Sequence, residues 1–283
     1  MKKVWIFGAG RTGANICRQL AGEASVEGFL DNDASYWGTT KEGRPVLGNA
    51  EALRGQLYDE VIIASPTALP VIRQQLLDAG VDPLRINGSY VETQVNARIN
   101  FLRDFAALGI EAPERCAVAE GGVFQGEFAK EINACFPGLT LHLFDTFEGF
   151  DQRDIDVELA RRFSEEKARH FNITSQELVR AKLPHPERAV FHKGYFPETA
   201  QGVTEGSFLF VNLDFDLYNP TLEGLRFFYP RMVEHGVILV DDYFLPGYLG
   251  IPNAIRDFEQ ELGTPLVKLP IGDHCGIAIV KQG

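Results

Sequence analysis

Cysteine is scarce in this 283-residue chain, and its spacing matches no common metal site. The four cysteines stand at Cys17, Cys116, Cys135 and Cys275, without a CxxC pair. This pattern excludes a disulfide framework and argues against a structural zinc ion. It is typical of reduced thiols, and we therefore expect a cytoplasmic protein.

Basic residues and long apolar runs are scarce as well. The 27 Lys and Arg residues are outnumbered by 39 Asp and Glu residues, giving a net charge of -12. Without a Lys/Arg-rich run to follow a phosphate backbone, nucleic acid is not an expected partner. No apolar stretch approaches the roughly 20 residues that span a bilayer, and the N-terminus lacks a cleavage site, so we expect neither membrane insertion nor export. A homo-oligomer is compatible with the sequence.

Apolar runs alternate with helical patterns over the first 90 residues. Strands are expected at 4–7, 26–30 and 61–64, with a helix at 12–20. Each parallel crossover needs a dozen or more residues, so this stretch has room for one half of a Rossmann sheet. We predict a small Rossmann-like domain over residues 1–95.

The alternation begins again at Cys116 and continues to the C-terminus. The expected elements are strands at 116–120, 139–144, 207–213, 237–240 and 276–280, and helices at 127–135 and 222–228, the latter after a turn over 218–221. We predict an α/β fold of two doubly wound Rossmann-like domains, the second over residues 96–283. A charged segment, 151–183, interrupts the second domain and is either a solvated helical face or a lid.

Carboxylates follow two of these expected strands. Asp214 directly follows the strand 207–213, and Asp241 and Asp242 directly follow the strand 237–240. If the strands are neighbours, their backbones lie about 4.8 Å apart and the acids share one point at the carboxyl edge, where open α/β sheets bind ligands.

Three such acids need compensation, because like charges at about 4 Å repel by roughly 4 kcal/mol at an effective dielectric near 20. Either protons or a cation must intervene, and an oxygen-bound divalent ion, Mg²⁺, is the simpler solution. The alternative is that the acids cap turns or helices. Asp216 is a rival ligand to Asp214.

A glycine-containing loop joins an expected strand to an expected helix earlier in the chain. Its residues are Glu120, Gly121, Gly122, Val123, Phe124 and Gly126. The glycines permit close backbone approach, as a cofactor-binding loop requires. Asp145 ends the next strand, where α/β nucleotide binders hold a ribose diol.

Five motifs, in order, resemble the macrocin-type (TylF/MycF-like) sugar O-methyltransferases over roughly residues 96–283. They are Glu120-x-Gly122-Val123-Phe124-x-Gly126, Asp145-Thr146-Phe147-Glu148-Gly149, Gly194-Tyr195-Phe196-Pro197-Glu198-Thr199, Leu213-Asp214-x-Asp216-Leu217-Tyr218-x-x-Thr221 and Asp241-Asp242-Tyr243. The resemblance implies a class I methyltransferase sheet, S-adenosylmethionine as methyl donor, Mg²⁺ as metal, and a hydroxyl of a sugar or glycoconjugate as acceptor.

The resemblance also implies roles for individual residues. Cofactor binding falls to the loop 120–126, with Gly121, and to Asp145, Thr146, Phe147 and Gly194. Asp145 would contact the ribose, and Asp214, Asp241 and Asp242 would hold the metal. Since Asp214 can touch both the ion and the acceptor, it is our candidate base.

Side chains near these motifs have two interpretations. Tyr218, Tyr243, Phe244 and Tyr248 form either an apolar platform for a sugar ring or part of the core. His192 and His274 lie near motif positions, where they either contact substrate or have a structural role, and we expect the structural role.

The first domain carries its own glycine-rich loop between a strand and a helix. Gly8, Gly10, Arg11 and Gly13 form a GxGxxG pattern, and Asp31 ends the next strand. In that context the pattern predicts nucleotide binding. A nicotinamide dehydrogenase is disfavoured, because only half the usual sheet fits and no hydride-transfer site follows.

Three runs of the domain, Gly28-Phe29-Leu30-Asp31-Asn32-Asp33, Gly43-Arg44-Pro45-Val46-Leu47-Gly48 and Ile62-Ile63-Ala64-Ser65, resemble more loosely the small Rossmann-like domain that precedes bacterial glycan-modifying enzymes. In the similar domain of sugar acetyltransferases, a nucleotide-linked sugar is bound. A degenerate docking or dimerisation module is an equal alternative. For the whole chain, the runner-up is a non-catalytic nucleotide-sugar-binding or assembly protein with a vestigial methyltransferase fold.

Overall fold

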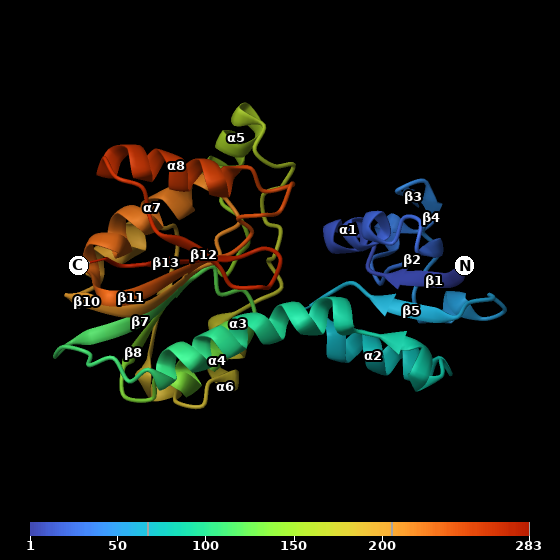
Figure 1. The fold of residues 1–283 in the computed structure, drawn as a ribbon, viewed down its shortest axis with the longest axis horizontal. Helices are drawn as coiled ribbons and strands as arrows, with labels where there is room; N and C mark the ends of the chain where they lie inside the picture. The colour runs from blue at the N-terminus through green and yellow to red at the C-terminus, as the bar shows by residue number, and fades with distance from the viewer. Residues whose placement is uncertain (67, 205, 283) are drawn as a thin grey trace. The chain divides into compact units, whose positions relative to one another are not determined.

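The computed structural model describes residues 1–66, 68–204 and 206–282, and the side chains of 93–96 also lie outside the described residues. The chain divides into two compact units, Met1–Asn96 and Ala97–Gly283. Figure 1 shows a separate sheet in each unit. The predicted boundary at residue 95 falls on the stretch 93–96, so its side-chain environment is not described.

The first unit contains a small parallel sheet covered on both faces. Its strands run in the order β2-β1-β5-β6 and are all parallel. The elements are β1 (Lys2–Phe7), α1 (Arg11–Gln19), β2 (Ala24–Leu30), the hairpin β3 (Thr40–Lys41) and β4 (Arg44–Pro45), β5 (Glu60–Ile63), α2 (Leu69–Asp78) and β6 (Ile86–Asn87). Ile16 of α1 packs in the core on one face, and Ile72 and Leu76 of α2 pack on the other. The continuous apolar strands are therefore explained by burial on both sides.

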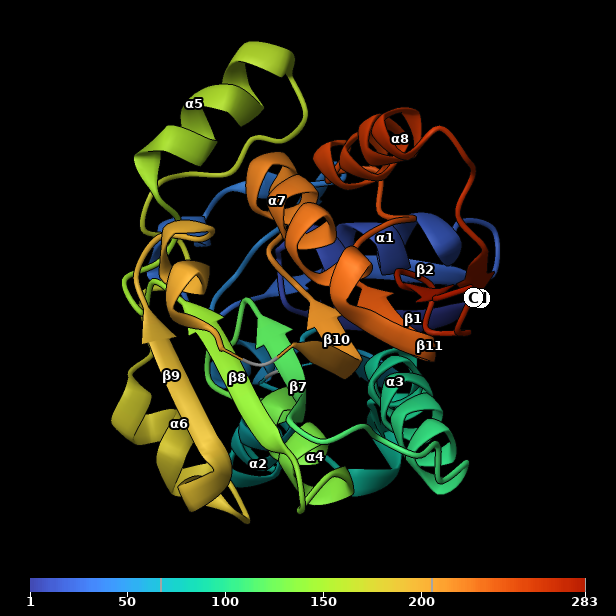
Figure 2. The same ribbon diagram turned by 90° about the vertical axis from the view of Figure 1, so that its left-hand side faces the viewer.

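The second unit contains a seven-stranded sheet in the order β12-β13-β11-β10-β7-β8-β9. Its strands are β7 (Cys116–Gly121), β8 (Thr140–Asp145), β9 (Ala189–Lys193), β10 (Ser207–Leu213), β11 (Met232–Val240), β12 (Lys268–Pro270) and β13 (Ile277–Val280). The pairs from β9 to β11 are parallel, whereas β13 is antiparallel to β11 and β12. Figure 2 shows the parallel strands side by side.

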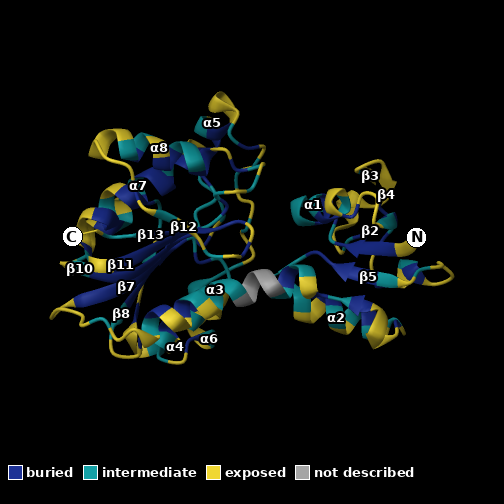
Figure 3. Cartoon of the chain, in the orientation of Figure 1, coloured by how far each residue is buried: buried dark blue, intermediate teal, exposed yellow. Residues whose placement is uncertain are grey.

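Helices cover both faces of this sheet, as Figures 1 and 2 show. They are α3 (Ser89–Ala107), α4 (Glu127–Cys135), α5 (Gln152–Arg161), α6 (Gln176–Lys182), α7 (Tyr218–Phe228) and α8 (Gly250–Leu262). The core on one face includes side chains of α7 and α8, and the core on the other includes side chains of α3, α4 and α6. The central strand β7 is buried throughout, and its neighbour β10 is buried except at its first residue, Ser207 (Figure 3). Within the described part of the chain, no helix is long and apolar enough to cross a membrane.

One local prediction differs from the structure. The turn predicted over 218–221 is wrong, because α7 begins at Tyr218. Pro220 lies in its first turn, where a helix tolerates a residue without an N–H group. The segment 151–183 forms two helices, α5 and α6, with irregular chain between them.

The strand order reverses between β7 and β10, which creates a topological switch point. Backbone hydrogen bonds continue past the strand ends here: Asp214 N–H donates to Gly121 O over 2.8 Å, and Asp241 N–H donates to Leu213 O over 3.0 Å. The carboxyl ends of β7, β10 and β11 therefore lie at one edge, in the position where open α/β sheets bind ligands.

Candidate active site

A carboxylate cluster lies at the ends of β10 and β11. These strands are parallel neighbours, with Leu213 paired to Val240, so the acids that follow them emerge side by side. Asp214 and Asp241 approach the same point, and Asp242 is buried beside them. The structure thus brings together the three acids that the sequence suggested for a metal.

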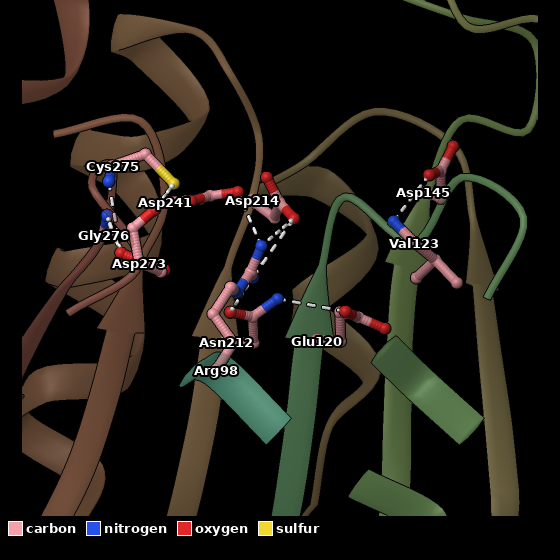
Figure 4. A network of polar contacts seen from close by, with 10 residues as sticks. All are labelled: Arg98, Glu120, Val123, Asp145, Asn212, Asp214, Asp241, Asp273, Cys275 and Gly276. Carbon is pink, nitrogen blue, oxygen red and sulfur yellow. Dashed lines mark hydrogen bonds and ion pairs between the residues drawn. The ribbon is translucent and has the colours of Figure 1, made fainter. Parts of the chain in front are cut away.

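An arginine from a distant helix lies between two of these acids. Nη1 of Arg98, in α3, is 2.6 Å from Oδ2 of Asp241, and Nη2 is 3.4 Å from Oδ2 of Asp214. Nη2 also donates to Oδ1 of Asn212 over 3.0 Å, and the guanidinium lies over the Phe128 ring. Figure 4 shows Arg98 reaching into the cluster. The sequence pattern predicted a metal ion or protons as compensation and gave no indication of this cation.

The charges of the cluster are only partly compensated. Burial raises the pKa of Asp214 well above its usual range, and neighbouring Asp241 raises it further against the opposing effect of Arg98. Burial also opposes ionisation of Asp241, but Arg98 overcomes it and lowers the pKa of that carboxyl. Asp216 lies within hydrogen-bonding distance of Asp242, and burial followed by that neighbour's charge raises its pKa. Arg98 therefore stabilises the ionised form of Asp241 but does not compensate the other acids of the cluster fully.

The donor atoms fit a hard divalent ion. Oδ1 of Asp241 is buried and accepts no hydrogen bond from the described residues. Carboxylate oxygens of Asp241 and Asp242 and Sγ of Cys275 lie within 4.8 Å of one another. Burial, followed by the charge of Asp241, raises the pKa of the Cys275 thiol, and a thiol is a poorer ligand for a hard ion than a carboxylate is. The remaining donors are oxygens, which Mg²⁺ prefers.

A chain of hydrogen bonds connects the cluster to the glycine loop. Asn212 accepts from Arg98 and donates through Nδ2 to Oε1 of Glu120 over 3.0 Å. Glu120 is 2% exposed, and burial raises its pKa to about 8. Its other oxygen has no partner among the described residues. In its neutral form Glu120 can therefore donate a hydrogen bond at the base of the site.

Asp145, at the end of β8, holds the glycine loop. Its Oδ2 accepts from the N–H groups of Val123 and Phe124 over 2.8 and 2.9 Å, and its Oδ1 accepts from Phe147 N–H over 2.6 Å. Burial nevertheless raises the pKa of Asp145. Because each carboxylate oxygen has two lone pairs, Oδ1 retains the capacity to accept from one further hydroxyl.

The other predicted cofactor residues surround this carboxylate. Gly122 N–H donates to Phe144 O over 2.9 Å, and Gly194 N–H donates to Asp145 O over 3.0 Å. Thr146 donates through Oγ1 to Gly149 O over 2.6 Å, which closes the turn after β8. Gly126 precedes α4 with a φ of 78°. These residues therefore lie around the ends of β7, β8 and β9.

The helix α5 is attached to the N-terminus of α7 by buried carboxylates. Oδ1 of Asp154 accepts from Tyr195 Oη over 2.9 Å and from Asn219 Nδ2 over 3.1 Å. One turn later, Oε1 of Glu158 accepts from Tyr218 N–H over 2.7 Å. No sequence signal marks Asp154 or Glu158 as functional, because acidic residues are ordinary on a solvated helix face.

The burial of Asp154 predicts a pH-dependent stability. Burial raises its pKa from 3.8 to about 6, so the folded state binds a proton that the unfolded state has released between these values. The contribution of Asp154 to the free energy of unfolding is therefore fully present below about pH 4, and it is lost as the pH rises through about 6. We expect Asp154→Asn to abolish this loss and to be more stable than wild type at pH 8 by about 1–3 kcal/mol.

Urea unfolding at pH 4.5 and pH 8 measures this effect. Asp156→Asn, at an exposed position of the same helix, is the control and should follow the wild-type pH profile. Equal pH profiles for Asp154→Asn and wild type would contradict the assignment.

The aromatic and histidine candidates divide between core and surface. Tyr218 and Tyr248 are buried in the core, whereas Phe244 is 49% exposed. For these two tyrosines, the structure supports the interpretation as core residues. His192 stacks on Phe144 with ring centroids 4.4 Å apart, which gives it a structural environment.

In the first unit, Asp31 organises the glycine-rich loop. Its Oδ2 accepts from Ala9 N–H over 2.7 Å, and its Oδ1 accepts from Asp33 N–H over 2.9 Å. Gly8, with a φ of 121°, and Gly13 pack together so tightly that a Cβ at Gly13 would lie 1.9 Å from Gly8 O. Gly10 precedes α1, which starts at Arg11. The predicted loop residues and Asp31 are thus brought together.

Comparison with known proteins gives two family matches. The TylF macrocin-O-methyltransferase family matches residues 117–274, more than half of the chain. A family described as C2185-like, N-terminal, matches residues 1–87.

A curated relative is similar to part of the chain. It is the 8-demethyl-8-(2,3-dimethoxy-alpha-L-rhamnosyl)-tetracenomycin-C 4'-O-methyltransferase of Streptomyces olivaceus, 27% identical over 142 residues. The match covers 48% of this chain and 51% of the relative, so the chain spans about half the length of that protein.

Solved structures are similar at lower identity. The O-methyltransferase NovP matches with a TM-score of 0.53 and 20% identity, over 66% of this chain and 80% of that chain. CalS11, a calicheamicin methyltransferase, matches with a TM-score of 0.48 and 20% identity, over 76% of this chain and 83% of that chain. The NovP similarity identifies the large, mostly parallel sheet as a class I methyltransferase fold.

Proposed function

The chain belongs to the TylF macrocin-O-methyltransferase family, and from this premise we propose that it transfers a methyl group from S-adenosylmethionine to a hydroxyl of a sugar or glycoconjugate. The acceptor class follows the sugar-modifying relative, which is named for an O-methyl transfer on a rhamnosyl group. The observation that carries the proposal is the carboxylate cluster at the switch point, one strand away from the glycine loop.

In this proposal the cofactor lies over the carboxyl ends of β7, β8 and β9. Glu120, the loop residues Gly121 to Gly126, Thr146, Phe147 and Gly194 surround it. Asp145 holds the loop through Val123 and Phe124 and accepts from a ribose hydroxyl with the remaining lone pair of Oδ1. The buried β-strand ends fix these groups, so much of the catalysis is alignment of donor and acceptor, which can supply roughly 7–11 kcal/mol.

Asp214, Asp241 and Asp242 are the proposed metal ligands, and Mg²⁺ is the proposed ion. When bound, such an ion lowers the pKa of a hydroxyl in contact with it. Asp214 is the proposed base. Arg98 contacts its Oδ2, so its Oδ1 is the oxygen that accepts the hydroxyl proton. Burial raises the pKa of Asp214, so in its ionised form it accepts a proton more strongly than an exposed aspartate does.

Methyl transfer from labelled S-adenosylmethionine to a panel of nucleotide sugars and rhamnosides tests the proposal. We expect transfer to at least one acceptor, its loss with EDTA and its recovery with Mg²⁺. Transfer that is unaffected by EDTA would refute the proposed metal dependence. Absence of S-adenosylhomocysteine binding in calorimetry would favour the non-catalytic alternative with a vestigial methyltransferase fold.

For the first unit, residues 1–95, we propose binding of a nucleotide or nucleotide sugar at the loop of Gly8, Gly10, Arg11 and Gly13. The support is the close packing of this loop at the end of β1 and its contact with Asp31. The full chain should gain thermal stability with UDP-sugars or dTDP-sugars. A gain with NAD instead would favour a nicotinamide site, and no gain with any of them would favour a docking module.

A further inference from the structure

Arg98 contacts one oxygen of each of two proposed metal ligands. Its bonds to Asp241 and Asp214 both go to Oδ2, over 2.6 Å and 3.4 Å. Oδ1 of Asp241 remains buried without a partner among the described residues. The guanidinium and a divalent ion therefore need not compete for the same oxygen atoms, because each carboxylate offers two.

The surroundings of Arg98 fix this arrangement. Its side chain is only 15% exposed, lies over Phe128 with Cζ 4.7 Å from the ring centroid, and donates to Asn212. A planar guanidinium can bridge three acceptors in fixed directions, which a lysine ammonium cannot reproduce. The contacts span α3, α4, β10 and the end of β11, so Arg98 is held from several sides.

The cluster holds more acidic than basic side chains. Asp214, Asp241 and Asp242 bring three acidic groups, and Arg98 brings a single positive charge to them. Removing one partner of a buried ion pair is strongly destabilising, because the remaining charge is left uncompensated. A divalent cation, when bound, would also supply positive charge to these carboxylates, as Arg98 does.

We infer that Arg98 is a positioning residue and resident counter-ion: it holds Oδ2 of Asp214 and Asp241 and offsets part of their charge before a divalent ion binds. The inference deepens the proposed function, on which its metal-dependent part rests. Arg98 lies in α3, before the residues 117–274 that match the family.

Thermal unfolding of the metal-free full chain tests the counter-ion role alone. Arg98→Met should lower the melting temperature by about 5–15 °C, and Arg98→Lys should lower it less. Adding Asp241→Asn to Arg98→Met should recover part of this loss, because it removes the uncompensated charge. Arg103→Met, which removes an exposed arginine of the same helix, is the control and should change little.

Recovery in the double variant is the readout that a purely structural role would not produce. Equal melting temperatures for Arg98→Met and Arg103→Met would overturn the inference. Failure of both Arg98→Met and its double variant to fold would also overturn it, because charge would then not be the cause.

The metal-dependent part is measured by repeating the experiment with saturating MgCl₂. We expect the Mg²⁺-induced rise in melting temperature to be about twofold larger in Arg98→Met than in wild type, because the ion replaces a missing counter-charge. An equal or smaller rise would overturn this part. If Mg²⁺ stabilises neither protein, the proposed metal function fails, while the metal-free comparison still decides the role of Arg98.

Discussion

Asp214→Asn is expected to reduce methyl transfer by at least about 100-fold while S-adenosylhomocysteine binds within about twofold of wild type. The amide keeps the size of the side chain but cannot accept the hydroxyl proton, and it removes one anionic metal ligand. Cofactor binding is expected to survive, because Asp145 and the glycine loop belong to β8 and β7, whereas Asp214 follows β10.

Steady-state transfer rates and calorimetry with S-adenosylhomocysteine measure the two halves of this prediction. Asp216→Asn is the matched comparison, because Asp216 lies two residues away and faces Asp242. We expect it to retain more activity than Asp214→Asn. The reverse order would transfer the proposed role to Asp216, and full activity of Asp214→Asn would remove Asp214 from the mechanism.

Gly122→Ala is expected to destabilise the protein by about 2–5 kcal/mol and to weaken both cofactor binding and transfer. Gly122 has a φ of 81°, and a Cβ there would lie 1.9 Å from the backbone oxygen of Asp214. The alanine must therefore strain its own backbone or displace the segment that carries the proposed base. Both the glycine loop and the carboxylate cluster should be affected.

Chemical unfolding and calorimetry with S-adenosylhomocysteine measure this prediction. Gly138→Ala is the control, because a Cβ at Gly138 would meet no atom within 4 Å. Stability and cofactor affinity of Gly122→Ala equal to those of Gly138→Ala would show that the loop does not depend on this close approach.

The positions of the acids were predictable from the sequence, because they directly follow apolar strands. Asp214 and Asp241 end runs whose burial on both faces leaves a clear pattern, and parallel neighbours place their ends together. The same reasoning located Asp145 at the end of β8. The end of a strand can be recognised from neighbouring residues, so a single sequence is sufficient to place these acids.

The counter-ion Arg98 was not predictable in the same way. It lies 116 positions before Asp214 and 143 before Asp241, on a helix without a motif. An arginine on an amphipathic helix is usually solvated, and only the packing of α3 against the sheet turns this one inward. Tyr218 and Tyr248 illustrate the same difficulty, since their burial depends on how α7 and α8 pack.

The most direct test of the central claim is a calorimetric titration of Mg²⁺ into the full chain with S-adenosylhomocysteine bound. If Asp214, Asp241 and Asp242 form a metal site beside the methyl donor, wild type will bind one ion per chain and Asp241→Asn will lose that binding. Absence of Mg²⁺ binding to wild type, or equal binding to both proteins, would contradict the account.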